Sequence, residues 1–202
     1  MSDGPRILIF EPEAAGHQME YIRHIVTCID QSIDNACIIL LTTTYAARHP
    51  NYLRLVEDFS NLISTRIVPE VNRNRFLAAA VGTNYERQWR DAERLHRGLE
   101  DIRLDNVDFV LLPYMESIGL LQLAFRRKMF RGKPWATIAG GIRFHHRKSG
   151  IEGPVRPIDI LQNILFRWVI RDPALVCFGT VNPYLSGSVA SVKVRYCPEP
   201  CA

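Results

Sequence analysis

Short runs of apolar residues alternate along the chain with stretches in which apolar side chains recur every three or four positions. The first run, Ile7–Phe10, is apolar at every position, and it leads into a stretch from Tyr21 to Ile33 with helical apolar spacing. A strand that is apolar on both faces and is followed by a helix is typical of a parallel sheet covered on both sides. The opening segment is therefore predicted to be the first half of a βαβ unit.

The same alternation continues to the end of the chain. Apolar runs predict further strands at 36–41, 64–68, 107–112, 135–139, 174–178 and 192–196. Helical spacing predicts helices at 52–63, at 73–104 with a break near Gly82, at 118–130 and at 157–170, and a brief helical turn at 182–185. The predicted fold class is α/β: a Rossmann-like three-layer α/β/α sandwich with a mostly parallel sheet of about seven strands, spanning residues 1–196.

The predicted fold also indicates where a ligand would bind. In a Rossmann strand order the first and fourth strands are neighbours, and ligands bind at the reversal between them, outside the carboxyl ends of the strands. This order would bring the loop Glu11–His17 beside the loop Tyr114–Ser117. The long basic loop Gly140–Pro157, after the fifth strand, would lie next along the same edge.

The first loop has a composition that disfavours nucleotide cofactors. A dinucleotide fingerprint needs three glycines so that the backbone can approach a pyrophosphate, and this loop holds only Gly16. Glu11 and Glu13 would also repel phosphate. The chain has no GxxxxGK[ST] motif either. We therefore expect no cofactor here, and a ligand rich in neutral hydroxyl groups, to which carboxylates, an imidazole and a tyrosine can hydrogen-bond.

Two residues are candidates for catalysis. His17 lies at a helix N-terminus, where the dipole favours the neutral ring that can act as a base, although it would serve equally as a helix cap. Glu116 is the second candidate, and the alternative is an acid that stabilises the following helix. Arg143, His145 and His146 could reach an anionic group or form an exposed loop. The expected substrate-binding residues are Glu11, Glu13, Gly16, Tyr114, Arg143, His145 and His146.

Charge and composition narrow the range of partners. The formal charge of +4, with a pI of about 8.9, is mildly basic and spread along the chain, which predicts no nucleic-acid binding. The 73–104 helix interleaves acids and bases, so we expect a solvated outer helix with pairs such as Arg87 and Asp91 on its wet side. The basic end of the 118–131 segment would either contact anionic lipid or cap a core helix.

Cysteine usage and the N-terminus point to a reducing compartment. Five cysteines are an odd number and fit core thiols better than disulfides. No metal site is expected from Cys197 and Cys201, nor from the helical face with His17, Glu20 and His24, because their spacings differ from those of metal motifs. The chain does not start like a signal peptide and has no apolar run of about 20 residues. We expect a cytoplasmic protein, with peripheral contact at the inner membrane face left open.

Two stretches resemble a known family. The run GHQMEYIRHI after an ILIFEP strand, and the ending VKVRY followed by a Pro-x-Pro segment, resemble the N-terminal domain of GT-B glycosyltransferases, family 4-like or group 1-like. The resemblance implies an acceptor-binding domain in which Gly16 and His17 line the interdomain cleft. Glu116 and the His145/His146 loop would share its rim, although the family often has a His-Asp pair where this chain has two histidines.

The resemblance also implies a missing partner domain. The C-terminal domain that binds most of the nucleotide-sugar donor is absent, and residues 197–202 would begin the interdomain linker. Alone, the chain should bind a sugar or a glycan- or lipid-linked acceptor weakly and transfer nothing. Two alternatives stay open: a stand-alone Rossmann-like module for ligand or protein binding, and a small hydrolase-like enzyme using Glu11, His17 and Glu116.

Overall fold

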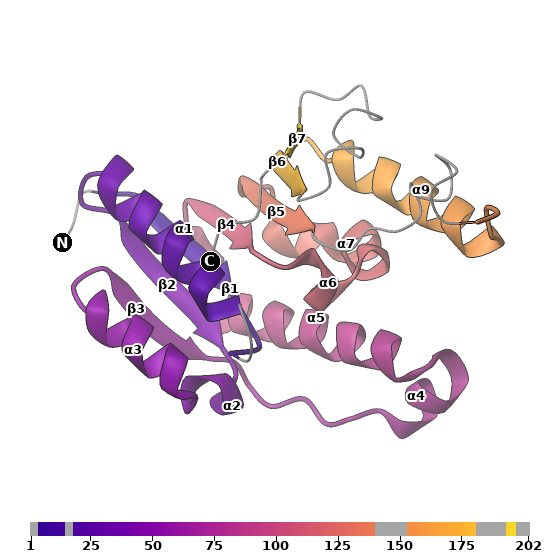
Figure 1. Cartoon of the computed structure of the whole chain (residues 1–202), viewed down its shortest axis with the longest axis horizontal. Helices are drawn as coiled ribbons and strands as arrows, with labels where there is room; N and C mark the ends of the chain where they lie inside the picture. The colour runs from indigo at the N-terminus through magenta and orange to yellow at the C-terminus, as the bar shows by residue number, and fades with distance from the viewer. Residues whose placement is uncertain (1–3, 15–17, 140–152, 181–192, 197–202) are drawn as a thin grey trace.

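The computed structural model describes residues 4–14, 18–139, 153–180 and 193–196, and it contains one seven-stranded sheet with helices on both faces (Figure 1). The strand order is β3-β2-β1-β4-β5-β6-β7, and every pairing is parallel. The strands are β1 (Arg6–Phe10), β2 (Cys37–Thr42), β3 (Ile63–Ile67), β4 (Phe109–Leu112), β5 (Trp135–Ala139), β6 (Leu175–Thr180) and β7 (Val194–Tyr196). The predicted α/β class, the seven strands and the pairing of the first strand with the fourth are confirmed.

The helices form two layers. They are α1 (Gln18–Ser32), α2 (Thr44–Ala47), α3 (Pro50–Asp58), α4 (Arg75–Val81), α5 (Thr83–Asp101), α6 (Met115–Ile118), α7 (Leu120–Arg126) and α9 (Pro157–Ile170), with 3₁₀ turns η1 (Leu104–Asn106) and η2 (Arg127–Phe130). Helices α1 and α3 pack on one face of the sheet, over β1, β2 and β3. Helices α5, α6, α7 and α9 pack on the opposite face of the sheet (Figure 1).

Strand β1 shows why the first apolar run had no polar position. Ile7 and Ile9 point into the core under α1 and α3, and Leu8 and Phe10 point into the core under α5 and α7. All four side chains are buried. Burial of each such side chain contributes about 1.5–3 kcal/mol, so the central strand stabilises both layers together.

Glycines with positive φ set the helix breaks. Gly82, at φ +93°, separates α4 from α5, as predicted. The predicted helix at 118–130 is instead three pieces: Gly119 at φ +80° ends α6 before α7 begins, and the last turn is the 3₁₀ turn η2. A Cβ atom at Gly119 would lie 2.4 Å from Oε1 of Gln88, so the Gln88 side chain occupies the space that a larger residue would need.

The other differences are local. The predicted helix at 52–63 begins earlier, at Pro50, which occupies the first helical turn, and Nδ1 of His49 accepts a hydrogen bond from the Asn51 amide. Helix α2 was not predicted, and the brief turn expected at 182–185 lies outside the described residues. In the described part of the chain, every helix is too short or too polar to cross a bilayer.

Candidate functional site at the carboxyl edge of the sheet

Glu11 continues the sheet beyond the end of β1. Its amide donates a hydrogen bond to the carbonyl of Leu41 at 3.0 Å, and its carbonyl accepts one from Oγ1 of Thr42 at 2.7 Å. Its exposed fraction is only 1%. The residue that the sequence places in a ligand-facing loop is therefore held in the interior at the root of that loop.

The Glu11 carboxyl group is incompletely paired. Oε1 accepts a hydrogen bond from the Glu13 amide at 3.0 Å, whereas Oε2 is buried with no hydrogen-bond partner among the described residues. Burial raises the pKa of Glu11 to about 8, against the opposing effect of the Glu13 amide, and the charges of Glu13 and Asp91 raise it further. At neutral pH Glu11 is mainly a neutral acid that can donate a hydrogen bond.

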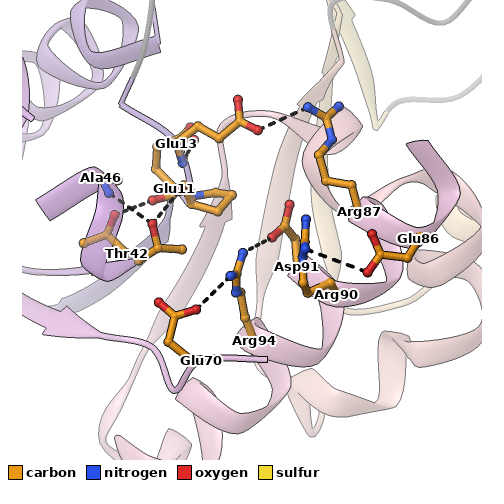
Figure 2. A network of polar contacts seen from close by, with 12 residues as sticks. Glu11, Glu13, Thr42, Ala46, Glu70, Glu86, Arg87, Arg90, Asp91 and Arg94 are labelled. Carbon is orange, nitrogen blue, oxygen red and sulfur yellow. Dashed lines mark hydrogen bonds and ion pairs between the residues drawn. The ribbon is translucent and has the colours of Figure 1, made fainter. Parts of the chain in front are cut away.

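Glu13 faces outward and links the loop to two helices. Its Oε1 accepts a hydrogen bond from Nη1 of Arg87 at 3.2 Å (Figure 2). Its Oε2 accepts one from Nε2 of Gln18 at 3.3 Å. Arg87 belongs to the second turn of α5, and Gln18 starts α1. The two acids of the first loop therefore have different states: one is neutral and buried, the other ion-paired and half-exposed.

Asp91 corrects a sequence prediction. The one-turn pair of Arg87 and Asp91 on the wet side of the helix is wrong, because Asp91 is 2% exposed and points inward. Asp91 Oδ1 accepts a hydrogen bond from Arg94 Nη1 at 2.9 Å, and Arg94 Nη2 reaches Glu70 at 3.0 Å (Figure 2). Burial raises the pKa of Asp91 although the Arg94 hydrogen bond opposes that rise.

The loop after β4 lies beside the loop after β1, as the strand order requires. The ring of Tyr114 is 5.6 Å from the ring of Tyr21 in α1, measured between centroids and inclined at 53°. Glu116 lies in α6, and its carbonyl accepts a hydrogen bond from Nε2 of Gln88 in α5 at 3.1 Å. Of the other predicted site residues, Gly16, His17, Arg143, His145 and His146 lie outside the described residues.

A cavity of about 420 Å³ opens next to α6, between α5, α7 and α9. Its polar lining consists of Asn84, Arg87, Gln88, Glu116 and Gln162. Its apolar and aromatic lining consists of Tyr85, Met115, Leu120, Leu121, Ile158, Leu161 and Leu165, with Gly119 completing the wall. The volume is in the range of small-molecule sites, and the mixture of polar and apolar walls suits an amphipathic ligand.

Most of this lining was missed by sequence reasoning. Glu116 was predicted, but Arg87 and Gln88 were assigned to a solvated helix and Gln162 was not considered. No local signal identifies them, because α5 packs on α6, and α9 packs on α7, only after the strand order is set. Within the described ranges, no group of three or more His, Cys, Asp or Glu side chains is placed to hold a metal ion.

Comparison with known proteins identifies the fold. No protein-family model matches the sequence, and no curated protein matches it. Among solved structures, the chain is similar to Phytolacca americana UGT2 complexed with UDP-2fluoro-glucose and pterostilbene: TM-score 0.57, 11% identity, 98% of this chain and 53% of that one. It is also similar to Medicago truncatula UGT71G1 complexed with UDP-glucose: TM-score 0.58, 10% identity, 89% of this chain and 46% of that one.

A third similar structure is a UDP-glucose:anthocyanidin 3-O-glucosyltransferase in complex with UDP, with a TM-score of 0.50, 10% identity, and coverage of 100% of this chain and 54% of that chain. This chain therefore spans about half the length of the structures it matches. At this level of identity, the comparisons establish a shared α/β Rossmann-like fold. That fold is the one found in about half of a glucosyltransferase chain.

Proposed function

We propose that this chain is the acceptor-binding half of a nucleotide-sugar-dependent glycosyltransferase. The observation that carries the proposal is the cavity at the carboxyl edge of the sheet, beside the loops that follow β1 and β4. Ligand sites of open α/β sheets lie at this position, where the strand order reverses. The similarity of fold to about half of three longer structures supports it, since all three are complexes with UDP or a UDP-sugar.

The cavity chemistry fits an acceptor that carries both hydroxyl groups and an apolar surface. Arg87, Gln88 and Glu116 supply hydrogen-bonding groups on one side. Leu161 and Leu165 of α9 supply an apolar wall on the other side. A sugar ring has hydroxyl groups on its edge and C–H groups on its faces, so a glycan-linked or lipid-linked acceptor would satisfy both walls.

Roles for individual residues follow as part of the proposal. His17 would act as the base that takes the acceptor hydroxyl proton, and Glu116 would assist from the cavity wall. Gly16, Tyr114, Arg143, His145 and His146 would form the rest of the acceptor rim. Glu13 would act indirectly by holding Arg87, and the neutral Glu11 would act as a hydrogen-bond donor at the root of the loop.

The donor half belongs to the same proposal. A nucleotide sugar would bind mainly to a second domain of the GT-B type, with residues 1–196 as the acceptor domain and 197–202 as the start of the linker. A family 4-like assignment, a cytoplasmic location and peripheral contact with the inner membrane face complete the proposal. Donor positioning supplies much of the geometry of transfer, so the isolated chain would bind acceptor without transferring sugar.

Binding of an aryl glycoside tests the cavity directly. Titration of the chain with p-nitrophenyl β-glucoside, followed by amide chemical shifts, should give saturable millimolar binding with shifts at Gln88 and Glu116. Gly119→Ala should abolish it, because the new Cβ would lie 2.4 Å from the Gln88 side chain.

Gly132→Ala is the matched control. Gly132 has almost the same backbone conformation, φ +78° against +80°, and nothing lies within 4 Å of its would-be Cβ. Both variants suffer the same backbone strain of roughly 1–2 kcal/mol, but only one disturbs the cavity. Binding that survives equally in both variants, or nanomolar affinity of the isolated chain for a nucleotide, would contradict the proposal and favour a stand-alone binding module.

A further inference from the structure

Helix α9 is apolar on both of its faces. Its inner face is buried through Leu165, Phe166 and Val169. Its outer face carries Ile160, Leu161, Ile164 and Trp168, which are between 45% and 57% exposed. A surface helix normally presents a polar stripe to solvent, and a helix that is apolar all round is normally buried. We therefore expect the outer face of α9 to be buried against another surface.

The apolar surface continues onto the neighbouring helix. Phe125 of α7 is 66% exposed, and its ring meets the ring of Trp168 edge-on with centroids 6.0 Å apart. Helices α7 and α9 lie side by side on the outer layer of the sheet (Figure 1). Leu161 also lines the cavity next to α6, so we call the surface formed by the other four side chains, Phe125, Ile160, Ile164 and Trp168, the α7–α9 face.

The charges around the α7–α9 face have one sign. Residues 120–133 and 153–171 hold eight of the 25 lysine and arginine residues of the chain and only one of its 21 acidic residues. That acid, Asp159, is 3% exposed and caps α9 by accepting a hydrogen bond from the Arg156 amide. Within the described part of these segments, the exposed charged side chains are Lys128, Arg131, Arg156, Arg167 and Arg171.

Glu93, an acid of the adjoining helix α5, is already paired with cations. Glu93 of α5 accepts hydrogen bonds from Arg126 at 2.8 Å and from Arg97 at 3.1 Å, and the Arg126 bond holds its pKa below the usual value. The α7–α9 face is consequently an apolar centre bordered by the exposed cations of its own segments, of which Lys128 and Arg131 also line a cavity with Glu93 and Glu100 of α5.

We propose that the α7–α9 face docks on an anionic lipid bilayer. The aliphatic and aromatic side chains would enter the boundary between headgroups and acyl chains, and the border cations would contact lipid phosphates. A membrane fits better than an acidic protein, because the centre of the face is a band of aliphatic and aromatic side chains, and tryptophan favours the membrane interface. The inference deepens the proposed peripheral contact, moves its centre from the basic 126–131 segment to α9, and does not depend on sugar transfer.

Vesicle sedimentation tests the proposal. The chain should co-sediment with phosphatidylcholine vesicles containing 30 mol% phosphatidylglycerol and not with pure phosphatidylcholine, and 0.5 M NaCl should weaken the binding. Arg167→Ser with Arg171→Ser should lower the partition constant about 30-fold. Ile164→Ser with Trp168→Ser should lower it more than about tenfold through loss of apolar contact.

Matched controls come from the opposite layer of the molecule. Leu53 and Arg54 of α3 are exposed, so Leu53→Ser with Arg54→Ser removes one apolar group and one charge at a distant surface and should leave binding unchanged. Each variant should keep the wild-type far-ultraviolet circular dichroism and the wild-type affinity for p-nitrophenyl β-glucoside. This second readout separates failure of membrane docking from failure of acceptor binding.

Three outcomes would overturn the proposal. The proposal is wrong if the wild-type protein does not co-sediment with anionic vesicles. It is also wrong if the α3 control loses as much binding as the α9 variants. Sedimentation velocity that reveals a dimer lost on Trp168→Ser, without vesicle binding, would assign the face to a second copy of the chain instead.

Discussion

Arg87 and Glu13 are 74 positions apart in the sequence, yet Nη1 of Arg87 donates a hydrogen bond to Oε1 of Glu13 at 3.2 Å. This pair ties the loop after β1 to helix α5. Arg87 also lines the cavity next to α6, so the same side chain connects the loop to the proposed acceptor site. A substitution in the loop can therefore change ligand binding without contacting the ligand.

The Arg87–Glu13 pair should contribute little to stability and more to binding. The two side chains are 44% and 37% exposed, and exposed pairs are worth about 0.2–1 kcal/mol. A double-mutant cycle with Arg87→Ala and Glu13→Gln, followed by urea unfolding, should give a coupling energy in that range. A coupling energy near 3 kcal/mol would mean that the pair is desolvated. In glycoside titrations, Glu13→Gln should weaken binding although Glu13 does not line the cavity.

Removal of Arg94 should lower the free energy of unfolding far more than loss of the Arg87–Glu13 pair. Arg94 is mostly buried and pairs with Asp91, a buried residue one turn earlier in α5. Arg94→Ala leaves that carboxyl group without its cation, and we expect a loss of about 2–4 kcal/mol in the free energy of unfolding. Arg97→Ala is the control from the same helix, because its pair with Glu93 is more exposed and worth less than about 1 kcal/mol. Equal losses in the two variants would contradict the buried placement of Asp91.

Glu11 should make stability fall as pH rises. Its pKa is about 8 in the folded chain against 4.5 for a solvated glutamate, so between these values the folded state holds a proton that the unfolded state has released. Its stabilising contribution is complete below about pH 4.5 and is lost progressively up to about pH 8, by roughly 3–5 kcal/mol.

Glu11→Gln keeps the shape of the neutral acid without its titration. Urea unfolding at pH 5, 6, 7 and 8 should show a variant that matches the wild type at pH 5 and exceeds it increasingly towards pH 8. The exposed residue Glu20 provides the control, since Glu20→Gln should leave the wild-type profile unchanged. Parallel profiles for wild type and Glu11→Gln would show that Glu11 is ionised in the folded chain.

Thr43 should be a structural support of the first loop. Its Oγ1 donates a hydrogen bond to the Pro12 carbonyl at 2.8 Å and accepts one from the Ala46 amide at 3.1 Å, which caps α2. Thr43→Val removes both bonds at a buried position, so we expect a loss of about 2–3 kcal/mol in thermal or urea unfolding. Thr83→Val, at an exposed helix start, should cost less than about 1 kcal/mol; a similar cost at both positions would exclude the loop-support role.

The fold was largely predictable from the sequence because its signals are local. A strand that is apolar on every position has to be covered on both faces, which is what β1 requires and what the two helix layers provide. Gly82 marked a helix break because its backbone conformation is costly for other residues. Gly119 has the same property, but the apolar spacing continues across it and concealed the break.

The candidate site was only partly predictable because burial depends on residues that are distant in sequence. Strand order alone placed the Glu11–His17 and Tyr114–Ser117 loops together, and the parallel pairing of β1 with β4 shows that the two loops start side by side. The cavity needed the docking of α5 against α6 and of α9 against α7, which no pattern within any of these helices specifies.

The sequence by itself determined the alternation of strands and helices, and with it the edge of the sheet at which a site would lie. Only the tertiary structure decided the state of each charge. Glu11 and Glu13 are two positions apart in one loop, yet one is neutral in the interior and the other pairs with Arg87. Likewise, periodicity could not distinguish the two apolar faces of α9. The physical reason is that solvent exposure and charge pairing are set by chain segments that meet only after folding.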